Sequence, residues 1–168
     1  MAILNPDHLF DQAEALVMPP EAGPPRQVDV RRSISAAYYG VFHGIAAAAA
    51  DEFVGRTKRS SNQYGLVYRA FGHRWLRDLC DDLRKQTPPQ RYSPYLPRNG
   101  FGPNVVAFAT AVVELQERRH AADYDPMVRV KTSDALAAIR TARAALRRFG
   151  NASIPRRRAF LTLLLFPP

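Results

Sequence analysis

A short polar segment in the last third of the chain carries the side chains best suited to phosphate chemistry. Arg119, Asp123 and Tyr124 follow one another closely, and His120 comes directly after the arginine. A guanidinium can hold a phosphate through two parallel hydrogen bonds, and an imidazole with a pKa of about 6.5 can transfer a proton. We therefore predict a phosphate-binding cluster in which the aspartate orients the arginine. The alternative is a structural ion pair, because arginine and aspartate four residues apart on a helix attract each other.

A second candidate cluster consists of Tyr38, Tyr39 and His43. These side chains have the right types to line a nucleotide pocket, and His43 joins Arg119, His120 and Tyr124 as a catalytic candidate. At helical spacing, however, aromatic residues more often belong to a core or to a dimer interface, so both interpretations stay open. A histidine on an apolar helix face needs a hydrogen-bond partner, and we expect a polar group beside His43.

Basic residues recur along one predicted helix near the end of the chain. Arg140, Arg143 and Arg147 lie three and four residues apart, so they form a ridge on one helix face. Such a ridge can contact successive phosphates of RNA, and we predict that it does. The alternative is an ordinary solvated face of a helix that buries its alanines and leucines.

Metal-assisted catalysis is a weaker hypothesis. Its candidate ligands are Asp51, Glu52, Asp81 and Asp82. Adjacent carboxylates point to different sides of a helix, and no paired Glu-x-x-His motif accompanies them. The sequence therefore predicts neither a metal nor a cofactor.

The elements that must position these residues are helices. Apolar residues recur at helical spacing in five segments, and no segment alternates convincingly as a strand does. The first predicted helix begins at Pro6 after an Asn5 cap and ends at Pro19, and the second runs from near Asp29 to Gly55. The third begins at caps in 60–62 and ends before Pro88. The fourth follows an Asn104 cap and ends before Pro126, and the fifth follows a cap at Thr132 or Ser133 and ends at Gly150. The proline-rich segments 19–25 and 87–103 are predicted loops. We predict an all-α, up-and-down bundle of about five helices in residues 1–150.

The remaining residues, 151–168, form a basic and apolar C-terminal tail. Arg156, Arg157 and Arg158 precede an apolar run that ends at Phe166. The run is too short to cross a bilayer, which requires about 20 apolar residues. We expect the tail to pack on its own bundle, to add to a partner, or to dock in a neighbouring subunit.

Composition favours one folded domain with an anionic partner. The chain has 168 residues, 46% of them hydrophobic, and a formal net charge of +9, which attracts nucleic acid or an acidic protein. Cys80 is its single cysteine, so an internal disulfide or a cysteine-rich zinc site within one chain is excluded. With no secretory signal and no membrane span in the sequence, we expect a cytoplasmic location.

Two segments carry a resemblance to a known family. The run Arg31-Arg32-Ser33-Ile34-Ser35-Ala36-Ala37-Tyr38-Tyr39-Gly40-Val41-Phe42-His43 resembles the second-helix signature of the HEPN family, helical domains associated with nucleotides and RNA. The run Arg119-His120-Ala121-Ala122-Asp123-Tyr124-Asp125-Pro126 is similar to the end of the fourth helix in one HEPN branch. The resemblance implies a homodimer, an RNA or nucleotide ligand, and a toxin–antitoxin or defence pair with a nucleotidyltransferase partner.

The dimer is also expected from the apolar surface of the second predicted helix. Tyr38, Tyr39, Val41 and Phe42 supply more apolar surface than one internal helix face needs. We therefore expect the second and fourth helices to form a symmetric interface.

The chain departs from the family at the residues that would cleave RNA. Active HEPN ribonucleases resemble one another in an Arg-x4-6-His motif, which needs no metal, and none of the four histidines here follows an arginine at that spacing. Tyr124 stands at the shortest spacing from Arg119, and a tyrosine with a pKa of about 10 is a poor base at neutral pH. We expect weak or absent ribonuclease activity. The alternative is a non-catalytic helical interaction module whose arginines are structural or bind an acidic protein.

Overall fold

The computed structural model describes residues 4–18 and 23–168, and the only regular secondary structure in these ranges is helical. Its helices are α1 (Pro6–Val17), α2 (Gln27–Phe53), α3 (Asn62–Tyr68), α4 (His73–Leu83), α5 (Gly102–Tyr124), α6 (Thr132–Asn151) and α7 (Ile154–Leu165), with 3-10 helices η1 (Arg56–Lys58) and η2 (Gln90–Tyr95). No strand occurs among the described residues, so the predicted all-α class is confirmed. Residues 19–22 of the predicted first loop lie outside the described residues.

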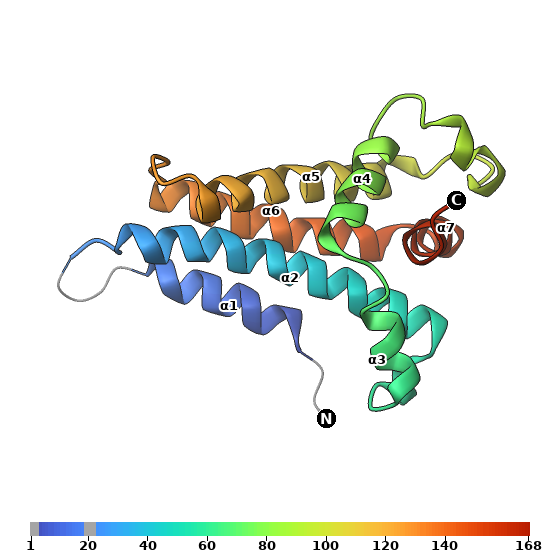
Figure 1. Cartoon of the computed structure of the whole chain (residues 1–168), viewed down its shortest axis with the longest axis horizontal. Coiled ribbons are helices and arrows are strands. Elements are labelled where there is room, and N and C mark those ends of the chain that lie inside the picture. The colour runs from blue at the N-terminus through green and yellow to red at the C-terminus, as the bar shows by residue number, and fades with distance from the viewer. Residues whose placement is uncertain (1–3, 19–22) are drawn as a thin grey trace.

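Four long helices run lengthwise and make the body of the molecule (Figure 1). Helix α2 lies in the middle, in contact with α1, α5 and α6, and successive members of this group run in opposite directions. Helix α4 crosses α5, while α3 projects from the end of α2. This arrangement is the predicted up-and-down bundle, with more helices than the five expected.

Helix starts follow the predicted caps in two cases. The Asn5 side chain accepts a hydrogen bond from the backbone N–H of Asp7 at 3.1 Å, and Ser61 accepts one from Tyr64 at 3.2 Å. Each bond satisfies an N–H that has no partner within its helix.

Two other predicted caps are wrong. Helix α5 begins at Gly102, and the Asn104 side chain instead donates to the carbonyl of Asn151 at 3.4 Å. Helix α6 begins at Thr132, and its cap is Lys131, whose backbone N–H donates to Asp134 Oδ2 at 3.1 Å.

The predicted third helix is two helices. Residues 69–72 separate α3 from α4, and Gly72 caps α4 with an extended backbone. The break turns the chain from the end of α2 onto α5, and it places His73 at the first position of α4. The predicted loop at 87–103 contains η2, whose Tyr92 is fully buried.

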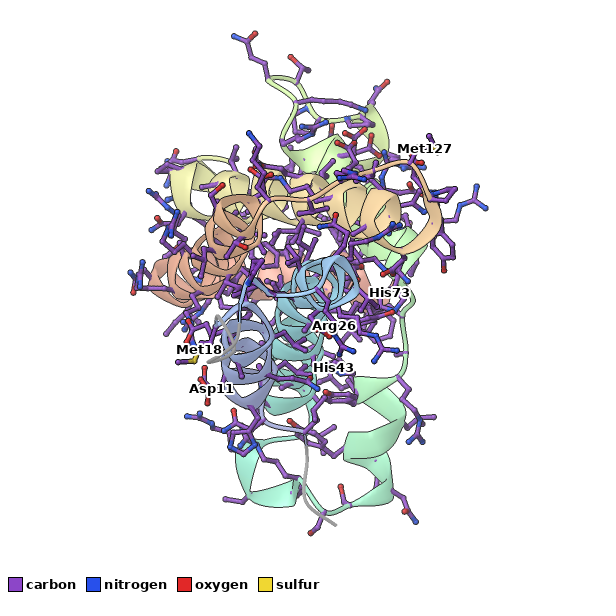
Figure 2. The ribbon with its side chains drawn as sticks, turned by 90° about the vertical axis from the view of Figure 1, so that its left-hand side faces the viewer. Asp11, Met18, Arg26, His43, His73 and Met127 are labelled. Atoms are coloured by element: carbon purple, nitrogen blue, oxygen red, sulfur yellow. The ribbon has the colours of Figure 1, made fainter. Side chains whose placement is uncertain are left out.

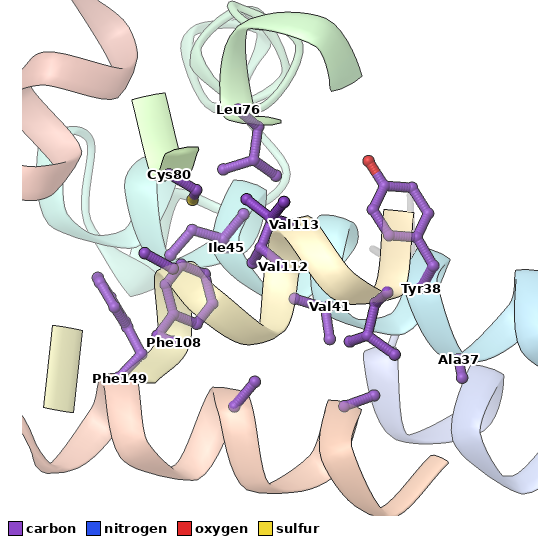
Figure 3. Packing of buried hydrophobic residues seen from close by; sticks show 14 of the residues in the cluster. Ala37, Tyr38, Val41, Ile45, Leu76, Cys80, Phe108, Val112, Val113 and Phe149 are labelled. Atoms are coloured by element: carbon purple, nitrogen blue, oxygen red, sulfur yellow. The ribbon is translucent and has the colours of Figure 1, made fainter. Parts of the chain in front are cut away.

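One apolar core joins the helices (Figure 3), with Phe108, Val112 and Val113 of α5 packed among α2, α4 and α6. Tyr38 and Val41 are completely buried in this core, so they supply nothing to a dimer surface. The expectation of a large apolar surface on α2 is therefore wrong for these two residues. Tyr39 and Phe42 are partly buried against the same core.

The C-terminal tail packs on its own bundle, the first of the three arrangements expected for it. Phe160 of α7 is fully buried, with ring centroids 5.5 Å from Phe108 and 5.4 Å from Phe149. The Trp75 indole N–H donates to the carbonyl of Leu164 at 3.0 Å. Among residues 4–18 and 23–168, no helix has both the length and the hydropathy needed to span a membrane.

Two glycines one turn apart let neighbouring helices approach α2 closely. A Cβ atom on Gly40 would lie 2.3 Å from the Phe10 ring, and one on Gly44 would lie 2.6 Å from Leu146. We expect Gly40→Ala to lower the free energy of unfolding by about 1 to 3 kcal/mol, because α1 must move away. Urea denaturation measures the change.

The matched control is Gly150→Ala in α6, where a Cβ atom would meet nothing within 4 Å. It should be neutral or stabilise the fold by up to about 1 kcal/mol, because alanine is the better helix former. Equal midpoints for the two variants would contradict the close approach of α1 and α2.

Candidate functional site

The two sequence segments that carry the family resemblance lie side by side, at the start of α2 and the end of α5. Arg31 joins them: its Nε donates to the carbonyl of Ala122 at 2.5 Å and its Nη2 to the carbonyl of Asp125 at 2.6 Å. The last carbonyls of a helix carry partial negative charge and lack helical partners, so a guanidinium there is stabilising. Arg31 thus fixes the end of α5 against α2.

Arg119 and Asp123 meet as predicted. Nε of Arg119 lies 2.9 Å from Oδ2 of Asp123, although its N–H does not point at that oxygen, so the contact is an ion pair and no hydrogen bond. The other carboxylate oxygen of Asp123 accepts a hydrogen bond from Ser35, and Nη2 of Arg119 donates to the Tyr39 hydroxyl at 3.1 Å. The pair is therefore structural, since it connects α5 to α2.

Aromatic rings surround the Arg119 guanidinium. Its Cζ lies 5.4 Å from the ring centroid of Tyr39 and 5.8 Å from those of Tyr38 and Tyr124. Each ring face carries partial negative charge and attracts the cation. The Arg119 side chain is 15% exposed. Its Nη1 donates no hydrogen bond to any residue that the structure describes.

A groove of about 750 Å³ lies beside this arginine. Arg119, His120 and Tyr124 line it, together with Arg77 and Gln116. The His120 and Tyr124 rings are 4.9 Å apart, and Tyr124 is 64% exposed. The structure thus brings three of the four catalytic candidates to one groove, and the fourth, His43, lies outside it.

His43 has the polar partner that its sequence position predicts. Its Nδ1 lies 2.8 Å from the Tyr68 hydroxyl, and its ring centroid lies 6.5 Å from that of Tyr39. Burial lowers the pKa of His43 and raises the pKa of Tyr68, so both groups are uncharged at neutral pH.

His73 completes the cluster and was not predicted. Its Nδ1 lies 2.9 Å from the Tyr38 hydroxyl, and its ring lies against Phe42 with centroids 3.9 Å apart. Burial lowers the pKa of His73, and the positive charge of Arg119 lowers it further. Figure 2 shows His43 and His73 on the same side of the molecule.

Sequence reasoning also missed Ser35, although a signal for it exists. Ser35 and Tyr39 lie one helical turn apart on α2, and Arg119 and Asp123 lie one turn apart on α5. Two such pairs match when helices pack side by side, because residues at this spacing share one face. No comparable pattern predicts the role of His73, because its position depends on the break between α3 and α4.

The three arginines of the predicted basic ridge have different surroundings. Nη2 of Arg143 lies 3.1 Å from Asp11 and 3.2 Å from Glu14, so this arginine connects α6 to α1. Its predicted role as a phosphate ligand is therefore not supported. Arg140 and Arg147 are exposed, and neither lines the groove beside Arg119.

The carboxylates of the metal hypothesis face basic side chains. Asp51 lies 2.6 Å from Arg59, Asp82 accepts from Lys85 and Arg91, both at 2.8 Å, and Asp81 lies 2.8 Å from Arg84. Glu52 pairs with Arg158. Across residues 4–18 and 23–168, no three side chains of the metal-binding types gather at one place.

Comparison with known proteins finds no family model, no curated protein and no solved structure that matches this chain. The likeness to the HEPN family therefore rests on the two quoted segments of sequence. In the structure the two segments contact each other through Ser35, Tyr39, Arg119 and Asp123.

The partly buried side chains of His43 and His73 should make stability depend on pH. Their folded-state pKa values are lowered, so the unfolded chain binds more protons once the pH falls below about 6.5. Stability is therefore fully present above this pH and is lost as the pH falls toward the folded pKa values. Thermal melting between pH 7.5 and 5.5 measures it, and a His43→Gln/His73→Gln variant should show a flatter profile.

The control variant His8→Gln/His120→Gln replaces the two exposed histidines and should keep the loss of stability at low pH. A wild-type melting temperature that does not fall over this range would contradict the assignment.

Proposed function

We propose that this chain is a HEPN-type protein that binds RNA or a nucleotide through a phosphate in the groove beside Arg119. In this proposal it acts in a toxin–antitoxin or defence pair with a nucleotidyltransferase partner, as the family resemblance implies. The observation that carries the proposal is the Arg119 side chain. Its guanidinium is fixed on two sides by Asp123 and Tyr39, while it lines a groove large enough for a nucleotide.

Pre-organisation makes this arginine a suitable phosphate ligand. Its orientation is already fixed by α2, so binding an anion immobilises little further side-chain freedom. Asp123 offsets part of its charge, and the groove is lined by Arg77 but also by the carboxylates of Glu117 and Asp125, so the attraction of an anion comes mainly from the net charge of +9 on the whole chain. The field therefore favours a polyanion over a neutral ligand.

Efficient cleavage is not part of the proposal. General-base catalysis requires a proton acceptor within hydrogen-bond reach of the reacting hydroxyl. Among the histidines only His120 lines the groove, and Tyr124 occupies the place of the family's histidine. His43 and His73 face tyrosine hydroxyls instead.

A homodimer belongs to the same proposal. Tyr124 and Met127 are 64% and 85% exposed at and just after the end of α5, where a second copy would cover them. This apolar surface replaces the one expected from Tyr38 and Val41.

The alternative function is a non-catalytic helical interaction module whose arginines are structural or bind an acidic protein. Two observations favour it: Arg143 is held by Asp11 and Glu14, and Arg119 is paired with Asp123. Arginines in such pairs stabilise the fold without any ligand. RNA binding discriminates the two functions.

Titration with single-stranded RNA tests the proposal. Binding should weaken as salt rises, because each neutralised phosphate releases condensed counterions. Arg119→Lys keeps the charge but loses the two-pronged geometry, and should lower affinity by about tenfold at constant salt. Fluorescence anisotropy at several salt concentrations measures both effects.

The matched control is Arg143→Lys, which alters another carboxylate-paired arginine and should leave RNA affinity unchanged. Absence of binding at low salt, or an affinity that ignores salt, would favour the acidic-protein alternative.

Cleavage is tested separately with labelled RNA in the presence of a chelator. We expect slow or no cleavage, because Tyr124 is a poor base at neutral pH. Rapid cleavage that disappears in His120→Ala would show that this histidine acts as the general base, and would overturn the proposal of weak activity.

A further inference from the structure

A second hollow, of about 600 Å³, lies between α2 and α3. Its lining includes His43 of α2, the polar residues 60–63 and the side chains of Tyr68 and Arg69. It shares no residue with the groove beside Arg119. A volume of about 300 to 1,000 Å³ is typical of pockets that bind small molecules.

The wall of this hollow is held in place by a buried tyrosine. Tyr64 of α3 is 1% exposed, and its hydroxyl oxygen lies 2.9 Å from a carboxylate oxygen of Asp51 and 3.3 Å from the carbonyl oxygen of Ala47, both of which can accept its single O–H. These bonds attach α3 to α2. The hollow is thus a built feature of the fold between two anchored helices.

One side of the hollow is aromatic and uncharged. The Tyr68 and His43 rings are nearly parallel, at 21°, with centroids 5.9 Å apart, and the hydrogen bond between them fixes both rings. Fixed planar rings favour another planar ring packed against them in an offset stack.

The rest of the lining includes Leu4 and Leu66, and its charged side chains are basic. Among the described residues no carboxylate lines the hollow, whereas Arg59 and Arg69 both do. Arg59 is occupied by Asp51, with Nη2 2.6 Å from Oδ2. For Arg69 no ion pair is formed with any side chain in residues 4–18 and 23–168, so its charge remains available to a ligand.

We propose that this hollow binds a small planar aromatic anion, with its ring against Tyr68 and His43 and its acidic group on Arg69. Ser60, Asn62 and Gln63 supply hydroxyl and amide groups for the polar edge of the ring. The acidic group is a carboxylate or a phosphate, so the ligand is an aromatic acid or a mononucleotide. The proposal is independent of RNA binding at Arg119, because the two sites share no residue.

Calorimetric titration of the full chain tests the site with two anionic probes, indole-3-acetate and adenosine monophosphate. Indole and adenosine are their uncharged counterparts. We expect at least one anion to bind, with an affinity about tenfold or more above that of its uncharged counterpart. Binding of one probe alone distinguishes an aromatic acid from a mononucleotide. Arg69→Gln should lower the affinity of the anion to that of the uncharged compound.

A blocking variant locates the ligand. Gly65 lines the hollow, and a Cβ atom there would come no closer than 3.6 Å to another side chain, that of Arg69. Gly65→Leu should therefore fold normally, fill the hollow and abolish binding. Gly150→Leu, at an equally open helical glycine, should bind as the wild type does.

Three outcomes would overturn the inference. The first is that neither anion binds at millimolar concentration, the second is that the uncharged compounds bind equally well, and the third is that Gly65→Leu binds the anion with wild-type affinity. Loss of RNA binding in Arg119→Lys without loss of the aromatic anion would separate the two sites.

Discussion

A charged group held between α2 and α5 determines much of the structure around it. The Arg119 side chain is mostly buried, and a charge taken out of water needs a compensating partner. Asp123 supplies the opposite charge, while Ser35 and Tyr39 supply hydrogen bonds from α2. Both helices must keep their relative register for these contacts to form. A shift of one residue along α5 would turn the arginine and aspartate by about 100° away from α2.

The same contacts connect structure with chemistry. Tyr39 bonds to Arg119 and lies near His43, and Tyr38 bonds to His73 while its ring lies near Arg119. The structural and the functional interpretation of Arg119 are therefore compatible. An arginine that holds two helices together is also an arginine whose position toward a groove is fixed. Asp123 stabilises Arg119 inside the protein, but its negative charge also weakens the attraction of Arg119 for an anion. The pair therefore limits the binding affinity that Arg119 can contribute.

Helical periodicity predicted most of the fold because the stripes of α1, α2 and α6 are read directly from the sequence. It failed at the third helix, where Val67, Phe71, Trp75 and Leu79 continue one phase across the break at 69–72. Only Gly72 marks the interruption, and a single glycine is tolerated within many helices. The sequence indicates that the apolar tail must pack against other residues. It does not indicate which residues these are, because most of them lie far away in the sequence.

The candidate site was also predictable only in part, because the sequence pattern of one helix shows local contacts and does not show contacts between helices. Spacing within one helix predicted the Arg119 and Asp123 pair, which is a local feature. The partners of that pair on α2, and the ion pairs of Arg143 with α1, depend on tertiary packing that one-helix patterns do not contain. His73 is the extreme case, since it reaches Tyr38 only because a turn ends α3 early.

The burial of Phe160 in α7 has a consequence for how the protein is made. Its neighbours Phe108 and Phe149 and the indole of Trp75 precede α7 in the chain and so leave the ribosome before it. A nascent chain that has emerged only as far as α6 can therefore form the contacts between α2 and α5, but its aromatic side chains that pack against α7 are still exposed. Apolar surface exposed in this way is prone to aggregate until α7 covers it.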